Sequence, residues 1–287
     1  MSLLLIFKRQ NVIRCLAGWA WPLAICVCSA PVLGQKADSV TFRLSLSLPV
    51  AAQFAACDQL GNTYVITAEN AIEKYAPDGR RLARYTQNRM GRATRLDVSN
   101  PLKIMVLYSD FRTTVFLDRS LTELGMLDWD AAGYPFVRCV ALASDGNLWL
   151  YDEVDFQLRK ITPTGEPLFE SQALNLLHDG PMPKPVCMLE SDNQVFLSDS
   201  VQGVFMFDAY AQFSKLLTFK GVGDFSVVEG RLFFIKGGFL HAEQIGAFRS
   251  EQTPLPEVAL ANGTRCFFNH GRLICVLNEQ IKILSNQ

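Results

Sequence analysis

The sequence lacks the features that mark nucleic-acid-binding proteins and several classes of enzyme. Its 27 lysines and arginines are balanced by 28 aspartates and glutamates, so no basic surplus is available to neutralise phosphates, and we expect no nucleic-acid partner. It contains no Gly-x-Ser-x-Gly nucleophile elbow and no glycine-rich phosphate loop. No long segment has helical periodicity; the best candidate, residues 169–177, is short and precedes a proline-rich stretch.

Histidine is scarce, with three residues in the whole chain, none of them in a metal-binding pair such as His-x-x-x-His. His178 is followed by Asp179, so one interpretation is a base with an orienting carboxylate, and the other is a solvated loop. His270 is expected at the tip of a hairpin. We predict no catalytic residue and no cofactor.

The first 34 residues have the layout of a secretory signal peptide. Lys8, Arg9 and Arg14 are their only charges, and an uncharged apolar stretch (15–33) follows. Cleavage after Gly34 would release a mature chain with 24 basic and 28 acidic side chains. A retained membrane anchor is the alternative, since 19 apolar residues lie near the spanning limit. We therefore predict export, with membrane contact only through an uncleaved leader.

Five of the eight cysteines lie beyond the leader, an odd number that forbids complete pairing within one chain. If residues 269–272 turn a hairpin, Cys266 lies opposite Cys275 at a non-hydrogen-bonded position, where Cα atoms approach most closely. A disulfide between these two is one interpretation. Two small thiols that pack as apolar residues are the other.

A cassette of short strands recurs about every forty residues, which is typical of a β-propeller. Its clearest copies begin at Cys57 and Ala143. Each copy has a first turn followed by a β-branched or aromatic strand. The first turns lie at Gly61-Asn62, Asn100-Pro101, Gly146-Asn147, Asn193-Gln194, Gly230-Arg231 and Gly271-Arg272.

The sixth cassette is one strand short at the C-terminus, and residues 40–48 (VTFRLSLSL) alternate as a strand at the other end. If this strand completes the last blade, it closes the ring and removes an open sheet edge. We predict an all-β, six-bladed β-propeller of four-stranded antiparallel blades over residues 35–287, closed by the N-terminal strand.

The turns GNTY (61–64) and DGNLWL (145–150), followed by KYAPDG (74–79) and KITPTGE (160–166), resemble blades of the NHL-like and lactonase-like six-bladed propellers. The resemblance covers residues 54–86 and 137–171, and it concerns blade geometry rather than active-site motifs. Members of that superfamily range from binding scaffolds to metal-dependent lactonases, so the resemblance implies a fold and leaves the function open.

A lactonase-like protein would hold a divalent cation in its central channel with oxygen ligands. The inner strands are expected to begin near Phe54, Arg95, Val137, Pro185, Phe225 and Thr264. Four of the polar residues there are basic (Arg95, Arg138, Lys184 and Arg265) and two are acidic (Asp97 and Asp224). Because crowded cations oppose a calcium-type site, we predict no metal.

These four basic residues would converge on one channel mouth, where they suit a carboxylate, a phosphate or an acidic partner segment. Pairing with nearby acids is the alternative. The aromatic residues Trp129, Tyr134 and Phe136 are expected on a long loop beside them, either as contact residues for a partner or as a cap on the blade.

Together these features predict a binding or scaffolding module of the bacterial envelope, periplasmic or associated with the outer membrane. Its partner would be another envelope protein, in outer-membrane assembly or secretion machinery. A lactonase-like hydrolase and a receptor for an anionic glycan or cell-wall fragment are the alternatives.

Overall fold

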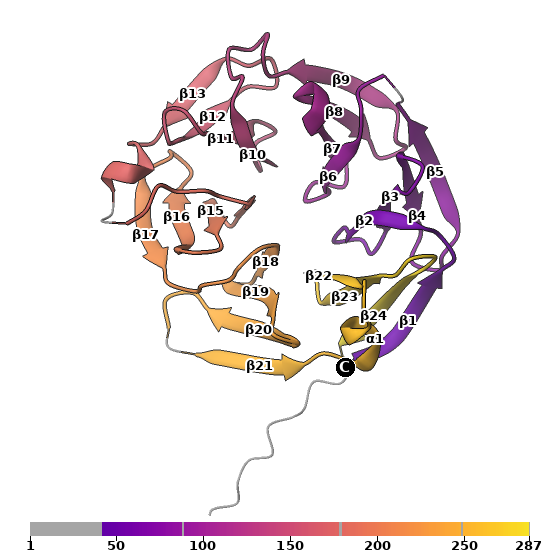
Figure 1. Cartoon of the computed structure of the whole chain (residues 1–287). Coiled ribbons are helices and arrows are strands. Elements are labelled where there is room, and N and C mark those ends of the chain that lie inside the picture. The colour runs from indigo at the N-terminus through magenta and orange to yellow at the C-terminus, as the bar shows by residue number, and fades with distance from the viewer. Residues whose placement is uncertain (1–41, 88, 178–179, 248, 287) are drawn as a thin grey trace, which may run out of the picture. The chain divides into compact units, whose positions relative to one another are not determined.

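The computed structural model describes residues 42–87, 89–177, 180–247 and 249–286, which form a ring of six four-stranded antiparallel sheets (Figure 1). The predicted six-bladed propeller is thereby confirmed. The predicted leader (1–34), the first two residues of the predicted N-terminal strand (40–41), and His178 with Asp179 lie outside the described residues.

The blades are numbered in chain order, and within each blade the strands run from the channel outward. The strands of blade 1 are β2 (Ala52–Cys57), β3 (Thr63–Thr67), β4 (Ala71–Tyr75) and β5 (Arg81–Thr86). Those of blade 2 are β6 (Ala93–Asp97), β7 (Lys103–Tyr108), β8 (Thr113–Asp118) and β9 (Glu123–Asp128). Those of blade 3 are β10 (Val137–Leu142), β11 (Leu148–Asp152), β12 (Gln157–Ile161) and β13 (Pro167–Glu170).

The second half of the chain repeats this pattern. The strands of blade 4 are β14 (Cys187–Ser191), β15 (Gln194–Asp199), β16 (Gly203–Asp208) and β17 (Phe213–Leu217). Those of blade 5 are β18 (Phe225–Val228), β19 (Arg231–Lys236), β20 (Phe239–Gln244) and β21 (Ser250–Pro254). Those of blade 6 are β22 (Arg265–Asn269), β23 (Arg272–Val276), β24 (Ile281–Asn286) and β1 (Phe42–Leu48).

The ring is closed by β1, as the sequence predicts. It pairs antiparallel with β24, so that Leu48 faces Ile281. The register shifts between Leu44 and Leu46, and the Ser45 hydroxyl in this bulge donates to the Ile283 carbonyl at 2.9 Å. Blade 6 therefore takes three strands from the C-terminus and its outer strand from the N-terminal side.

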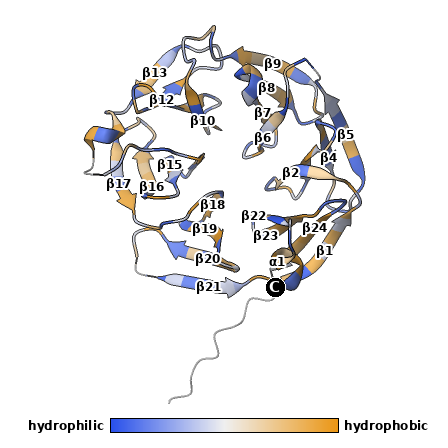
Figure 2. Ribbon diagram, viewed as in Figure 1, coloured by the Kyte–Doolittle hydropathy of each residue, from blue (hydrophilic) through white to orange (hydrophobic). Residues whose placement is uncertain are grey.

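The hydrophobic core lies between blades rather than within one layer. Buried apolar side chains form clusters at all six interfaces between neighbouring blades. Tyr64 and Ile72 of blade 1 pack with Val106 and Leu117 of blade 2, for example. The outer strands are more polar: Figure 2 shows β21 and most of β5 in neutral to hydrophilic colours. Each blade therefore depends on its two neighbours for burial.

The turns use the residues that their backbone requires. His270 and Gly271 both have positive φ, 45° and 73°, as a two-residue hairpin turn of type I′ demands. At Gly203, with φ of 130°, an added Cβ would lie 2.0 Å from the Leu217 carbonyl oxygen, so only glycine fits.

Helical structure is confined to short turns in the part of the chain that is described. These are η1 (Ser109–Phe111), η2 (Leu174–Leu176) and α1 (Glu257–Leu260). The turn η2 falls in the segment that the sequence marks as its best helical candidate. None of the described helices has the length and apolar content needed to cross a membrane.

Candidate functional site

One face of the ring, which we call the mouth face, carries the loops that precede the inner strands and the loops between the second and third strands of each blade. These loops share a face because neighbouring strands are antiparallel: Val137 at the start of β10 lies opposite Asp152 at the end of β11. The inner strands begin within two residues of the predicted positions, at Ala52, Ala93, Val137, Cys187, Phe225 and Arg265.

Two cavities follow one another along the channel at this face. A mouth pocket of about 530 Å³ lies among the first residues of the inner strands, and a channel cavity of about 290 Å³ lies among later ones. Arg95 and Asp224 line both cavities. They therefore mark the boundary between the open mouth and the interior of the channel.

Arg95 crosses the channel. It begins on β6 of blade 2, and its guanidinium donates to the Asp224 carboxylate, which directly precedes β18 of blade 5. The same group lies 3.4 Å from the Val186 carbonyl oxygen and 2.9 Å from the Cys187 sulfur, at the start of blade 4. Arg95 is thus bound to acceptors on the far side of the ring.

The other three basic residues differ in their surroundings. Arg138 pairs with Glu153 of its own blade and donates through Nε to the Pro185 carbonyl at 2.6 Å. Lys184 has an exposed side chain, while its backbone N–H donates to Asp199 at 2.7 Å. Arg265 lines the mouth pocket with Arg95. The structure thus brings the predicted set to one face, but Arg95 and Arg138 are already neutralised by acids.

The three predicted aromatic residues separate into two kinds. Trp129 and Tyr134 are buried in the cluster between blades 2 and 3, and the Trp129 indole donates to the Thr114 hydroxyl at 3.0 Å. They cap the blade interface and are not available as exposed contact residues. Phe136, by contrast, is 56% exposed. Loop position alone does not distinguish these cases, because a long loop can fold its aromatic residues inward.

Exposed apolar side chains form an arc on the mouth face over blades 2 to 4, and we call this set the apolar arc. Their exposed fractions lie between 41% and 65%, and the set comprises Phe111, Phe136, Val154, Met182, Val186 and Val201.

Hydrogen bonds tie the loops of the arc to one another. Arg112, beside Phe111, donates to the Pro135 carbonyl at 3.2 Å, and the Glu153 N–H donates to the Phe136 carbonyl at 3.0 Å. The Gln202 amide donates to the Pro181 carbonyl at 3.0 Å. Hydrogen bonds therefore hold together the loops that carry the arc, those of blades 2 and 3 with one another and the two loops at blade 4 with one another.

Sequence reasoning missed Phe111, Val154 and Val201. All three lie in the loop between the second and third strands of successive blades. The signal that could have revealed them is an apolar residue in the same turn of three repeats, where polar residues are the rule.

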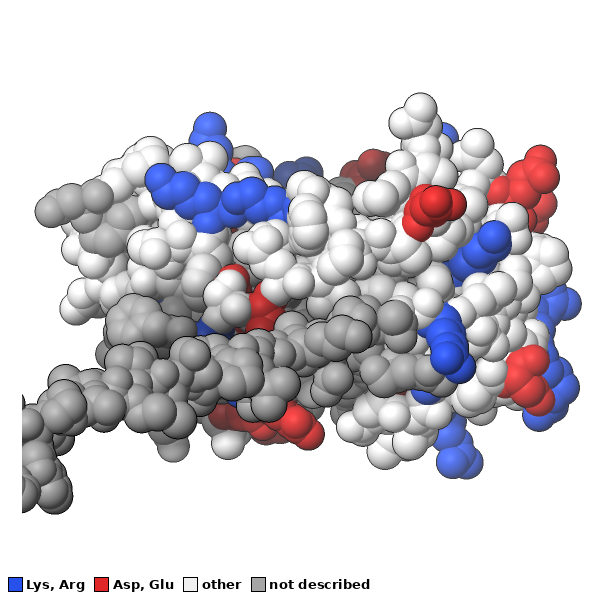
Figure 3. Space-filling view, turned by 90° about the horizontal axis from the view of Figure 1, so that it is seen from below, with Lys and Arg blue, Asp and Glu red and all other residues white. Residues whose placement is uncertain are grey.

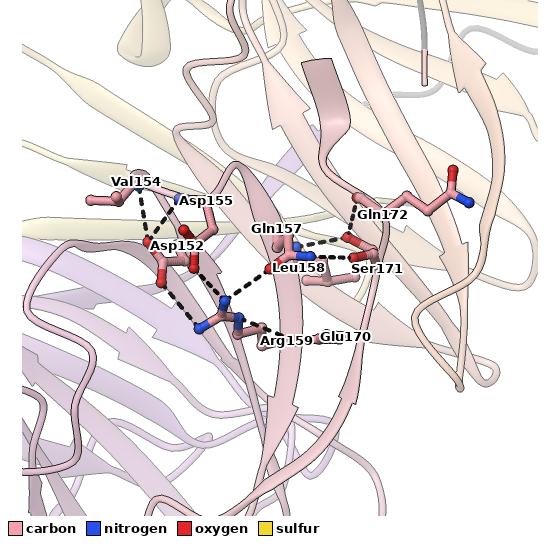
Figure 4. Close-up of polar contacts among 9 residues, drawn as sticks. All are labelled: Asp152, Val154, Asp155, Gln157, Leu158, Arg159, Glu170, Ser171 and Gln172. Atoms are coloured by element: carbon pink, nitrogen blue, oxygen red, sulfur yellow. Dashed lines mark hydrogen bonds and ion pairs between the residues drawn. The ribbon is translucent and has the colours of Figure 1, made fainter. Parts of the chain in front are cut away.

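A second polar cluster lies on blade 3, where Arg159 of β12 is surrounded by acids (Figure 4). Its guanidinium pairs with Asp155, lies 3.4 Å from Asp152 and 3.9 Å from Glu170. It also lies over the Tyr134 ring, 5.8 Å from the ring centroid. Because three carboxylates already surround this arginine, its role is to hold the loop 152–157 against the outer strand.

Cys139 and Cys187 of the inner strands are buried and weakly acidic. Burial raises the pKa of Cys139 to about 12 and that of Cys187 to about 11. Cys266 faces Cys275 as predicted, with the two sulfur atoms 3.6 Å apart, and both are free thiols in this structure. The predicted alignment is confirmed, and the disulfide stays a prediction.

The acids of the channel are engaged in structural contacts. Asp97 accepts from the Leu142 N–H of the next blade at 2.8 Å, and Asp224 accepts from Arg95. Among the described residues, no group of three or more His, Cys, Asp or Glu side chains gathers closely enough to hold a metal ion. On the side of the molecule in Figure 3, basic and acidic side chains are interspersed among uncharged ones.

Solved structures of similar fold include a streptogramin B lyase, with 13% sequence identity over 87% of this chain and 98% of the other and a TM-score of 0.59. A virginiamycin B lyase from Staphylococcus aureus has 11% identity over 85% of this chain and 99% of the other, with a TM-score of 0.58. BamB from Moraxella catarrhalis follows at 10% identity, over 80% and 81% of the two chains, with a TM-score of 0.46.

The two lyase structures, whose TM-scores exceed 0.5, show a shared fold, and at these identities they carry no activity to this chain. No protein-family model matches the sequence, and no curated protein sequence matches it.

Proposed function

We propose that this propeller is a binding or scaffolding module of the bacterial cell envelope that docks another envelope protein on its apolar arc. The observation that carries the proposal is the set of six exposed apolar side chains on loops of one face of the ring, over blades 2 to 4. Exposed apolar side chains gathered on one face are typical of protein interaction sites, whereas those scattered singly over a surface are ordinary. A role in outer-membrane assembly or secretion machinery is part of this proposal.

The polar rim of the arc fits a protein partner. Arg112, Glu153 and Asp155 border the apolar residues, and Arg112 and Asp155 are themselves exposed. An apolar centre with a charged rim is the common anatomy of protein–protein interfaces. Phe136 and Phe111 are the side chains that we expect to contribute most to binding, since large aromatic residues dominate such interfaces.

Site-specific photo-crosslinking tests this function. A photoreactive phenylalanine analogue at position 136 or 201 should crosslink to one envelope protein in intact cells. The same analogue at Leu102, which is 67% exposed on the opposite face, is the matched control and should not. Recovery of uncrosslinked protein from positions 136 and 201, or equal crosslinking from position 102, would contradict docking on the arc.

Export belongs to the same proposal and has its own test. If the leader is removed after Gly34, the mature protein begins at Gln35. N-terminal sequencing of the protein from a periplasmic fraction checks this directly. A mature protein that begins at Met1 in the cytoplasmic fraction would overturn export, and one that begins at Met1 in the membrane fraction would support the anchor.

Two other functions predict different observations at the channel. A lactonase-like hydrolase, of the propeller superfamily that the blade sequences resemble, requires a bound divalent cation with several oxygen ligands there. A glycan receptor requires exposed aromatic platforms beside Arg95, Arg138, Lys184 and Arg265. The engagement of Asp97 and Asp224 by protein groups supports the binding module over the hydrolase.

A further inference from the structure

The mouth pocket has a polar side that is not internally compensated. Three arginines line it, Arg92, Arg95 and Arg265, against the single carboxylate of Asp224. Arg95 is neutralised by Asp224. The side chains of Arg92 and Arg265 are exposed, and neither has an ion pair or side-chain hydrogen bond with any residue that the structure describes. The pocket therefore presents two positive charges without partners.

Asp110, which contacts the main chain of Arg92, does not change this balance. Asp110 of η1 accepts from the backbone N–H of Arg92 at 3.1 Å, so its carboxylate is engaged by the main chain rather than by the guanidinium. It does not line the pocket. An anion in the pocket would thus meet two free guanidinium groups.

The pocket lining also has an apolar part that is carried on strands. Phe54 at the start of blade 1 and Phe267 of blade 6 line it, with ring centroids 4.8 Å apart and ring planes at 60°. Both rings are half-buried, and each is held on an inner strand. A contact surface of this kind favours an apolar group on the ligand.

From this arrangement we infer that the mouth pocket binds an organic carboxylate whose apolar group lies against Phe54 and Phe267. Arg92 and Arg265 hold the carboxylate, because the guanidinium fork matches its two oxygens. An organic carboxylate fits better than inorganic phosphate, because it carries the apolar group that Phe54 and Phe267 favour. This site is separate from the apolar arc and does not depend on the proposed docking function.

Calorimetric titration of the propeller with N-acetylphenylalanine tests the inference, with N-acetylphenylalaninamide as the uncharged control. The acid should bind, and the affinity of the amide should be lower by at least about tenfold, because a charge-assisted contact is lost. Arg92→Gln and Arg265→Gln should each weaken binding of the acid by about tenfold. Arg80→Gln, an exposed arginine on the opposite face, is the matched control and should have no effect.

A carboxylate of this chemistry can come from a free organic acid or from a peptide C-terminus. A short peptide that ends in phenylalanine, with a free or an amidated end, distinguishes the two. Tighter binding of the free-ended peptide than of the acid assigns the site to chain ends, and weaker binding assigns it to small acids.

Three results would overturn the inference. The first is that the acid does not bind at a concentration of about 10 mM, at which a specific site of this size would be occupied. The second is that the acid and the amide bind equally well. The third is that folded Arg92→Gln and Arg265→Gln variants bind the acid as the wild type does. Circular dichroism establishes that the variants fold. A Phe136→Asp, Val201→Asp variant should bind the acid normally, so failure of the docking proposal and failure of this one are distinguishable.

Discussion

Arg95 and Asp224 are joined by an ion pair although 129 residues separate them and their blades, 2 and 5, lie on opposite sides of the ring (Figure 1). The interblade clusters connect neighbours only, whereas this contact spans the channel. Its members are partly exposed, with side-chain exposures of 29% and 45%. The pair thus spans the channel where the two cavities meet, while staying within reach of solvent.

Removing the charge of Asp224 should cost stability. Asp224→Asn leaves the Arg95 guanidinium with neutral acceptors only, and we expect the free energy of unfolding to fall by about 1 kcal/mol, the range of partly exposed pairs. Urea denaturation of Arg95→Gln, Asp224→Asn and the double variant measures the coupling. The exposed pair Arg84–Glu69, 3.4 Å apart, is the matched control and should show almost none. Equal coupling for the two pairs would contradict a special role for the channel pair.

Glu190 of blade 4 is expected to hold blade 3 in place. Its carboxylate accepts from the Trp149 indole N–H and from the Ser144 N–H at 3.0 Å. Glu190→Ala leaves the buried indole donor unpaired, so the free energy of unfolding should fall by about 1–3 kcal/mol. Glu190→Gln keeps an acceptor and should lose less than half of that. If both variants unfold at the same urea concentration, the hydrogen bonds are not what Glu190 contributes.

The closing strand can be tested with two leucines of the same strand. Leu48 is buried between blades 6 and 1, while Leu44 is 57% exposed. Leu48→Ala should lower the free energy of unfolding by about 2–4 kcal/mol through lost burial and a cavity. Leu44→Ala should change it by no more than about 0.5 kcal/mol. Comparable losses in the two variants, measured by urea denaturation, would argue against closure by β1.

Cys266 should be the most reactive thiol of the described residues. The hydrogen bond with Cys275 lowers the pKa of Cys266, whereas burial raises the pKa values of Cys139 and Cys187. Because the thiolate is the nucleophile, Cys266 becomes reactive at lower pH than the others. In reduced protein, iodoacetamide should label Cys266 at least about tenfold faster than Cys139 or Cys187 near neutral pH, as followed by peptide mass spectrometry.

The same labelling reports on the predicted disulfide. Protein isolated from an oxidising compartment without reductant should leave both Cys266 and Cys275 unlabelled if the bond forms. Cys275→Ser should restore labelling of Cys266 under those conditions. Full labelling of Cys266 in the unreduced wild type would show that the pair stays reduced.

Local sequence signals predicted the fold because each repeat carries them. The turns at Gly61, Gly146 and Gly271 identify positions where positive φ is needed, and all three glycines have it. The alternating pattern of residues 40–48 predicted the closing strand, and the hairpin expected at 269–272 predicted that Cys266 faces Cys275. These are short-range patterns, which can be recognised in the sequence without knowledge of the tertiary structure.

The candidate site was harder to predict because it depends on where side chains go after the ring has formed. Repeat spacing placed Arg95 at the mouth, but only the closed ring shows that it reaches Asp224. Trp129 and Phe136 lie seven residues apart in one connection, and only packing decides that the first is buried and the second exposed. No periodicity encodes that choice, since loop residues have no fixed face.

Ring closure also determines when the last blade can fold relative to synthesis of the chain. Ser45 and Ile283, bonded across the closing pair, are 238 residues apart, so at ordinary translation rates β1 waits roughly 10 to 50 s for its partner strand to be made. Of the described strands, β1 on the outside of blade 6 is therefore the first to be synthesised and the last to be paired. Completion of the ring follows synthesis, and the loss of either β1 or β24 damages the same blade.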